Sequence, residues 1–296
     1  MMIKPYKGLL LCLFSCGSFI AVAQTKTNQS ESTDEKPGFE IKLNYLSNSV
    51  FMGRADSIQT SVITPQLNYA FSNGIYLSGS LYVVPNRKKS KIDGGDITLG
   101  YDFDLTDKLS GGLSFTKFFY SSNSTQVSSS QSSTVSSNLS YDNDFIIPAL
   151  TADYNFNKQG VTGDIFLNIG LSHNFDFDGI FGKDDGLTLS PTIEANTGTQ
   201  NFYNGYVAYR KRKNVQNSAA ATALLQTYQS ELSQYKLLDY EFSMPVEYST
   251  GNITFNICAT YALAQNQFKS AAVVKALGLT SQSSVFYFDI GLALKF

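Results

Sequence analysis

The last twelve residues of the chain alternate apolar and polar side chains. Phe286, Phe288, Ile290, Leu292, Leu294 and Phe296 share one phase, and Asp289 and Lys295 fall on the other. Because successive side chains of a β-strand point to opposite faces, this segment predicts a strand with one continuous apolar face. Six apolar residues on one phase, three of them aromatic, predict a face that contacts hydrocarbon.

The same alternation recurs between turn signals along the chain. Apolar stripes occupy alternate positions of residues 39–45, 63–71, 75–83, 97–105, 109–120, 146–156, 165–175, 187–195, 238–248 and 253–263. With the last segment they predict at least eleven strands. A further strand at about 199–209, after a turn near Thr197 and Gly198, brings the number to about twelve and returns both ends to one side. The alternative is ten strands, with 203–236 as an irregular excursion.

The N-terminal segment 1–23 has the layout of a cleavable signal peptide. Two lysines precede an apolar run from Leu9 to Ile20, and a small-residue box ends at Ala23. We expect cleavage after Ala23, a mobile leader over 24–37, and a single barrel domain over 38–296. Cleavage before Cys16, as in a lipoprotein, is the alternative. No other part of the chain approaches the 18 consecutive apolar residues of a transmembrane helix.

Cysteine usage and charge restrict the class further. Cleavage would leave Cys258 as the one remaining cysteine, so stability must come without disulfides, as a closed hydrogen-bonded barrel provides it. The formal net charge of −2 is too small to imply nucleic-acid binding.

Together these features resemble the outer-membrane β-barrel proteins of Gram-negative bacteria. The resemblance implies an all-β fold, a transmembrane antiparallel up-and-down β-barrel, located in the outer membrane in contact with lipid and lipopolysaccharide. It also implies that the barrel assembly machinery reads Phe288, Ile290, Leu292, Leu294 and Phe296 as an assembly signal. It is specific for architecture and location, and leaves activity and oligomeric state open.

Loop lengths then set strand directions, because such barrels have short periplasmic turns and long external loops. The short connections are 72–74, 106–108, 157–160 and 249–252, and the long ones are 85–94, 121–139, 178–186 and 266–284. Residues 121–140 are a low-complexity run of Ser, Thr, Asn and Gln, which predicts a solvated, mobile loop. Residues 218–235 have helical apolar spacing and predict a short helix in an external loop, either capping the rim or plugging the lumen. Residues 270–279 are a second, shorter candidate helix.

The polar phase of the strands is rich in carboxylates. The predicted pore-lining residues are Glu40, Lys42, Asp96, Asp102, Asp104, Asp153, Asp164, Glu194, Glu241, Glu247 and Asp289, and Asp239 and Lys295 share their phase. In a water-filled barrel this lining would concentrate cations, because a low-dielectric wall focuses the field. The alternative is that these carboxylates hydrogen bond to Tyr, Ser, Asn and Lys across a closed lumen.

Basic residues cluster in two predicted external segments. They are Arg87, Lys88 and Lys89 in one, and Arg210, Lys211 and Arg212 in the other. Basic side chains above an aromatic girdle could bind lipopolysaccharide phosphates, and a solvated charged rim is the alternative.

Catalytic and metal-binding signals are weak. The single histidine, His173, shares its phase with Leu171 and Phe175, which predicts a girdle residue at the lipid interface. The acidic residues of 176–185 lack the spacing of an EF-hand loop, so we expect no metal and no cofactor.

The sequence therefore predicts a narrow channel for ions or small polar solutes with an acidic lumen. The alternative is a closed structural or surface-interaction barrel that binds a partner or lipopolysaccharide through its external loops. We do not expect an enzyme.

Overall fold

The structure is a computed structural model. It describes residues 37–55, 59–88, 90–121, 124, 126–143, 145–158, 162–204, 223, 226–267 and 283–296. The predicted signal peptide 1–23, most of the leader (24–36), Lys89, Arg210, Lys211, Arg212 and segment 270–279 lie outside these residues. None of the helices in the described part is long and apolar enough to cross a membrane.

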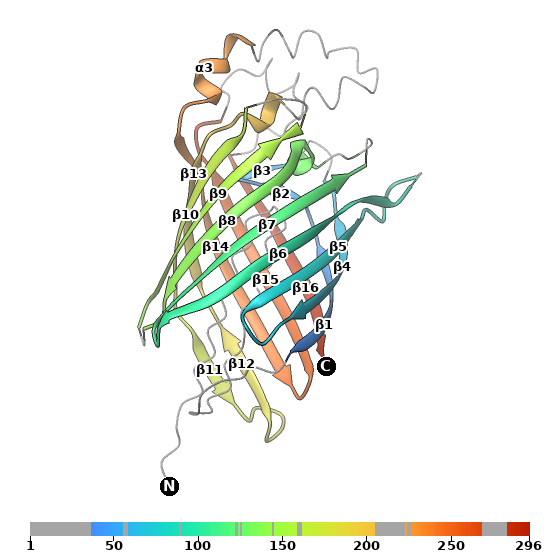
Figure 1. Cartoon of the computed structure of the whole chain (residues 1–296), viewed down its shortest axis with the longest axis vertical. Helices are drawn as coiled ribbons and strands as arrows, with labels where there is room; N and C mark the ends of the chain where they lie inside the picture. The colour runs from blue at the N-terminus through green and yellow to red at the C-terminus, as the bar shows by residue number, and fades with distance from the viewer. Residues whose placement is uncertain are drawn as a thin grey trace.

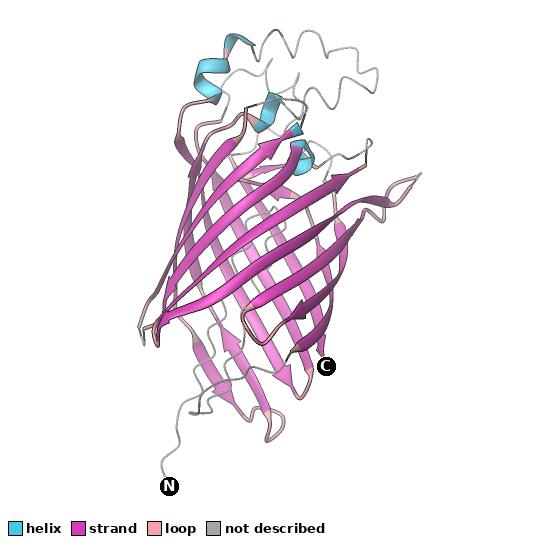
Figure 2. Ribbon diagram, in the orientation of Figure 1, coloured by secondary structure: helices cyan, strands magenta, loops and turns pink. Residues whose placement is uncertain are grey.

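Twelve antiparallel strands close into a tilted barrel (Figures 1 and 2). They are β1 (Gly38–Leu46), β4 (Val62–Ala70), β5 (Ile75–Val83), β6 (Ile92–Thr106), β7 (Leu109–Tyr120), β8 (Gln131–Tyr141), β9 (Ile147–Asn157), β10 (Asp164–Ser172), β13 (Thr192–Gly198), β14 (Lys236–Thr250), β15 (Ile253–Ala264) and β16 (Ser284–Lys295). Each strand pairs with its neighbour in the chain, and β1 pairs with β16. The predicted all-β up-and-down barrel is confirmed.

The β1–β16 seam closes the cylinder. The pairing runs from Glu40 opposite Lys295 to Leu46 opposite Asp289. Beyond this ladder, the Phe296 N–H donates to the Phe39 carbonyl at 2.8 Å, and the Phe39 N–H donates to the Phe296 carbonyl at 3.3 Å. Closure therefore leaves no free sheet edge among the twelve strands, which is the condition for placing strands in hydrocarbon.

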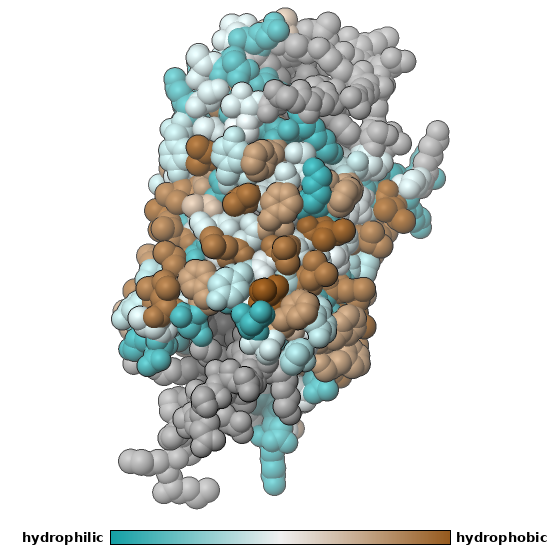
Figure 3. Space-filling model, viewed as in Figure 1, coloured by the Kyte–Doolittle hydropathy of each residue, from teal (hydrophilic) through white to brown (hydrophobic). Residues whose placement is uncertain are grey.

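The outer face of the barrel is predominantly apolar. Figure 3 shows hydrophobic side chains gathered across the middle of one side of the barrel. The C-terminal strand fits this pattern, because Phe286, Phe288 and Ile290 point outward and are exposed. A belt of this extent would be unstable in water and is suited to lipid. The chain is a membrane-spanning barrel of the outer-membrane type.

Two further strands lengthen one side of the barrel. β11 (Phe175–Asp178) and β12 (Asp185–Leu189) form a hairpin that continues the registers of β10 and β13. Ser172 pairs with Thr192 at the end of the β10–β13 ladder, and Phe175 pairs with Leu189 at the start of the β11–β12 ladder, so the register is the same on both sides of the break. Pro191 lies at the break between the two ladders, where its missing N–H interrupts the pairing. The hairpin lies at the end opposite to α3 (Gln229–Leu232), as Figure 1 shows.

The prediction of a mobile loop over 121–140 is wrong. Residues 131–141 form β8, and Val127–Ser130 form a buried 3₁₀ turn, η1. The sequence pattern did not predict this strand because its outward positions carry few large apolar side chains, chiefly Val135, Leu139 and Tyr141. Its inward positions are hydroxyl residues that hydrogen bond to β9, such as Ser136 to Asp153 at 2.5 Å.

The prediction of a strand at 199–209 is also wrong within the described residues. β13 ends at Gly198, and 202–204 are helical. The total of twelve is correct because this false strand replaced the missed β8. The missed strand also reversed the predicted directions of β9, β10 and β13, and the false strand restored the direction of β14 and of the strands after it. The 178–186 connection therefore lies on the short-turn side, and β9 and β10 are joined on the same side as α3.

Strand directions now agree with the loop lengths. Residues 71–74, 107–108, 142–146 and 251–252 and the β11–β12 turn lie at one end, which we call the periplasmic end. The longer connections lie at the other, the external end, among them 47–61 and 199–235. The short helix α3 belongs to the latter connection, as predicted, and lies over the external rim (Figure 2).

Candidate functional site

The lumen gathers the polar side chains. Of the predicted lining residues, Glu40, Asp96, Asp153, Asp164, Glu194, Glu241 and Asp289 are buried inside the barrel, Lys42, Asp102 and Glu247 are half-buried, and Asp104 is exposed near the periplasmic end. They face inward because the outward phase of each strand is apolar. The structure does not place them in one cluster, and their surroundings differ from wall to wall.

One wall carries an acidic patch, which we define as Glu194, Asp239, Glu241 and Asp289. Adjacent strands bring Glu194 opposite Glu241 and Asp239 opposite Asn196. Asp289 lies opposite Cys258 two strands further round. All four side chains are buried, so the acidic patch occupies the interior of β13, β14 and β16.

Hydrogen bonding satisfies this patch only in part. The Tyr287 hydroxyl donates to Glu241 Oε2 at 3.2 Å. Both carboxyl oxygens of Asp239, one of Glu194 and one of Asp289 make no hydrogen bond within the part of the chain that the structure describes. Burying a carboxylate is costly unless a cation or a donor accompanies it. The acidic patch therefore favours a positive charge beside it.

On the opposite wall the carboxylates of Asp96 and Asp153 have hydrogen-bond donors. Thr134 donates to Asn155 at 2.6 Å, and the Thr98 and Thr116 hydroxyls are 2.8 Å apart. Asp96 accepts a hydrogen bond from the Tyr82 hydroxyl. On this wall the carboxylates hydrogen bond across neighbouring strands, as the alternative interpretation of the lumen requires.

An ion pair between a lysine and a glutamate lies near the periplasmic end of the lumen. Lys42 Nζ lies 3.0 Å from Glu40 Oε2, which also accepts from Asn68 Nδ2 at 3.0 Å. The positive side chain of Lys42 offsets one of the carboxylates at this level. The uncompensated acid therefore lies toward the external half.

The external end is filled by a segment that folds inward. After β1 the chain forms a two-stranded hairpin, β2 (Val50–Phe51) and β3 (Arg54–Ala55), whose residues are buried. We call residues 50–55 the plug hairpin; it lies near the α3 end of the barrel in Figure 1. Val50 and Ala55 pack against Ala262, Val285 and Tyr287. Phe51 and Met52 join a second cluster, with Val127, Phe166, Phe202, Tyr203, Leu232 and Leu238. Phe166 faces inward from β10, so this cluster lies within the lumen.

Arg54 fastens the plug hairpin to its surroundings. Its guanidinium donates to the Leu238 carbonyl at 2.8 Å, the Gln265 carbonyl at 2.8 Å, the Tyr203 hydroxyl at 3.1 Å, Gln200 Oε1 at 3.3 Å and the Met52 carbonyl. A guanidinium has five N–H donors, so these bonds use its full capacity. Met52 and Gly53 at the tip have positive φ angles, and Gly53 packs on Asp239 so closely that an added Cβ would lie 2.8 Å from that residue's Cβ.

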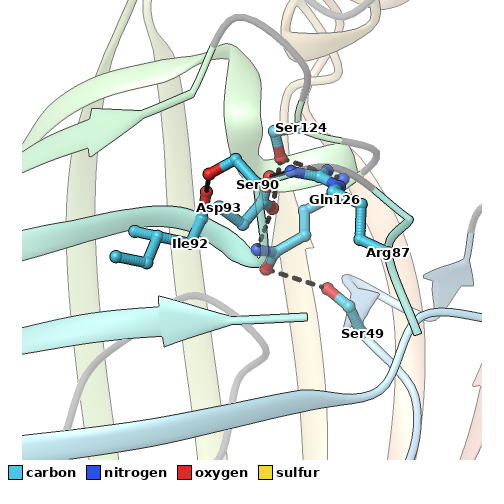
Figure 4. A network of polar contacts seen from close by, with 7 residues as sticks. All are labelled: Ser49, Arg87, Ser90, Ile92, Asp93, Ser124 and Gln126. Carbon is cyan, nitrogen blue, oxygen red and sulfur yellow. Dashed lines mark hydrogen bonds and ion pairs between the residues drawn. The ribbon is translucent and has the colours of Figure 1, made fainter. Parts of the chain in front are cut away.

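A second polar network joins the loops at the external end (Figure 4). The buried Asp93 carboxylate lies 2.7 Å from the Arg87 guanidinium and accepts from Ser124 and Gln126, each at 2.7 Å. Gln126 in turn accepts from Ser49, which precedes the plug hairpin, at 3.3 Å. Two connections and the one that carries the plug hairpin are thereby tied together at one point.

The remaining predicted sites are less organised. Arg87 is held by Asp93 inside the chain, and Lys88 is exposed. His173 contacts the rings of Phe145 and Phe175, and its Nδ1 lies 2.7 Å from the Phe145 carbonyl oxygen, as suits a girdle residue. No group of three or more His, Cys, Asp or Glu side chains in the described ranges could hold a metal ion.

The acidic residues around the β11–β12 turn have a structural role. Asp185 accepts hydrogen bonds from the Phe181 and Gly182 N–H groups at 2.9 and 2.8 Å and from the Tyr248 hydroxyl at 2.9 Å. These contacts organise the turn of the hairpin.

Sequence reasoning missed the plug hairpin and Arg54. The signal for them is the apolar run of Val50, Phe51 and Met52 followed by Gly53 within an otherwise polar connection. An apolar run in a loop indicates a buried loop, and the only interior available is the lumen.

Among proteins of known structure, the fold of this chain is similar to that of other outer-membrane barrels. No protein-family model and no curated protein matches the chain. Among solved structures, a KdgM porin is 11% identical with a TM-score of 0.47, covering 88% of this chain and 99% of that one. A NanC porin is 13% identical with a TM-score of 0.46, covering 87% and 100%. LpxR from Salmonella typhimurium is 7% identical with a TM-score of 0.43, covering 86% and 99%. At these values the function has to be argued from the residues of this chain.

Proposed function

We propose that this barrel is a narrow channel of the outer membrane for small cations and small polar solutes. The observation that supports it most is the acidic patch, which has buried carboxyl oxygens without hydrogen-bond donors in the described structure. Such a wall attracts positive charge into the barrel and repels anions.

Barrel size supports a narrow passage. Eight-stranded barrels are filled by their side chains, and barrels of sixteen strands hold an open aqueous pore. Twelve strands lie between these limits, so side chains from opposite walls leave room for small solutes only.

The second candidate function is a closed barrel that acts through its external surface. The observation that favours it is the apolar cluster around the plug hairpin, which fills the external end of the lumen. In that case the exposed basic rim, including Lys88, would contact lipopolysaccharide or another partner.

Ion selectivity in planar bilayers separates the two candidates. With a KCl gradient, we expect a reversal potential that indicates cation preference. The double variant Asp239→Asn/Glu241→Gln should lose most of that preference, because it removes two carboxylates while keeping side-chain size. The matched control, Asp176→Asn/Asp178→Asn, removes the same charge from exposed β11 and should retain the preference.

Three results would count against the channel. They are anion preference in the unaltered protein, equal selectivity in the lumen variant and the control, and absence of conductance from every form, including those in which the external end has been opened. The last result would favour the closed barrel.

A further inference from the structure

We propose that residues 47–55 of the β1–β4 connection form a displaceable plug and that Arg54 is the latch that keeps it in the lumen. This inference rests on the proposed channel function, because a plug regulates passage only where there is passage. It assigns a regulatory role to a segment that the barrel wall itself does not need.

The wall is complete without the plug. Leu46 pairs with Val62 at the external end of the β1–β4 ladder, so a tight turn could join the two strands there. The chain instead inserts a long connection, and its residues 47–55 are buried. External loops usually lie on the surface, so this inward course requires specific contacts to hold it.

The plug hairpin lies outside the strand ladder of the barrel. β2 and β3 pair with each other in a separate two-stranded sheet and do not join the ladder of the barrel. The plug is held by the hydrogen bonds of Arg54 and the Ser49–Gln126 bond, by two apolar clusters, and by the Ser47 N–H, which donates to the Phe288 carbonyl at 2.9 Å. It can therefore leave the lumen while all twelve strands stay paired.

Arg54 links the plug to the electrostatics of the lumen. Its positive charge lies on the same hairpin tip whose Gly53 packs against Asp239 of the acidic patch. With the plug in place, Arg54 supplies positive charge beside these carboxylates, which otherwise have few donors. When the plug leaves, that charge leaves too, and small cations from solution can take its place.

Cys258 provides a native reporter of lumen access. It is the one cysteine beyond residue 23, it is buried, and it lies on the inward phase of β15 opposite Asp289. A small methanethiosulfonate reagent reaches it only through the lumen. Comparing a trimethylammonium reagent with a sulfonate reagent of similar size measures both the openness of the lumen and its charge preference.

The experiment compares four variants with the unaltered protein in proteoliposomes and planar bilayers. In the first variant, residues 47–61 are replaced by a short Asn-Gly turn. Arg54→Ala removes the latch, Arg54→Lys keeps the charge without the five-bond geometry, and Lys183→Ala is a control that removes a cation from the exposed β11–β12 turn. Heat-modifiable mobility on gels verifies that each variant folds as a barrel.

We expect excision of 47–61 and Arg54→Ala to raise conductance at least tenfold, and to raise the fraction of Cys258 that reacts rapidly with external trimethylammonium reagent. Arg54→Lys should give an intermediate increase, and Lys183→Ala should match the unaltered protein. If all forms conduct equally well and are labelled at Cys258 equally fast, the plug proposal is overturned and the channel proposal stands. Faster labelling after excision, without conductance in any form, would retain the plug and overturn the channel. If no form conducts and excision does not change the labelling of Cys258, both the plug proposal and the channel proposal are overturned.

Discussion

Truncating Phe51 tests whether the apolar cluster belongs to the plug or to the fold. Phe51 is 3% exposed, and its ring meets those of Phe202 and Phe166 edge-on at centroid distances of 5.1 and 5.7 Å. Replacing a buried phenylalanine by alanine in a packed core costs about 3–5 kcal/mol. Phe51→Ala should weaken the plugged state by that order.

The loss should appear as opening and not as unfolding. Because the barrel strands are paired without the plug hairpin, the lost packing energy stabilises only the plugged arrangement. A loss of about 3–5 kcal/mol shifts the ratio of open to plugged molecules by roughly two to three and a half orders of magnitude, at about 1.4 kcal/mol per factor of ten. If the plugged state is favoured by less than this amount, most molecules become open.

Two assays on the same samples separate these outcomes. The labelling rate of Cys258 measures access to the lumen, and the urea midpoint of barrel unfolding in liposomes measures the fold. We expect Phe51→Ala to raise the labelling rate of Cys258 strongly and to leave the urea midpoint almost unchanged. Phe145→Ala, which truncates a phenylalanine that is 75% exposed, is the matched control and should change neither. A lowered urea midpoint with unchanged labelling would refute the reasoning, because Phe51 would then be part of a permanent core.

Other predictions concern the wall, the seam and the loops. An added Cβ at Gly100 would lie 2.2 Å from Cζ of Tyr76, so Gly100→Ala should lower the unfolding free energy by about 1–3 kcal/mol in urea titrations, whereas Gly38→Ala, with nothing within 4 Å, should have no effect. Phe296→Ala keeps the backbone bonds of the seam, so slower insertion with normal final stability would support a role in assembly, and unchanged insertion kinetics would contradict it. Asp93→Asn removes the charge that holds Arg87, and we expect faster proteolysis of the external loops in intact cells; unchanged cleavage would mean that the network does not hold them.

The lipid-facing side of the strands could be predicted from the sequence, because lipid outside the barrel and a polar lumen inside it require apolar and polar side chains to alternate along each strand. In strands such as β1 and β16, lipid requires apolar residues on one phase, and the polar lumen leaves the other phase free. β8 escaped this rule because serine is tolerated on both faces. A single missed strand then reversed the predicted directions of β9, β10 and β13, so that the β11–β12 turn was expected on the wrong side.

The acidic residues of the lumen could also be predicted, but their partners could not. Phase alone assigns Asp153 and Asp239 to the same face, although Ser136 satisfies the first carboxylate and the second has no hydrogen bond in the described structure. Which strands neighbour each other, and in which register, decides that difference. The plug hairpin was missed for a related reason, since its contacts with Phe166, Phe202 and Leu238 join residues that are far apart in sequence.

The seam between β1 and β16 makes barrel formation a late event. Its closing bonds join Phe39 and Phe296, which are about 250 positions apart, and bringing such distant ends together costs about 5 kcal/mol of chain entropy beyond a constant. Until that pair forms, β1 and β16 are open edges and the apolar face has no stable place in water. Pairing between such distant strands predicts slow folding, so we expect formation of the β1–β16 hydrogen bonds to be the step after which the barrel stays in the membrane.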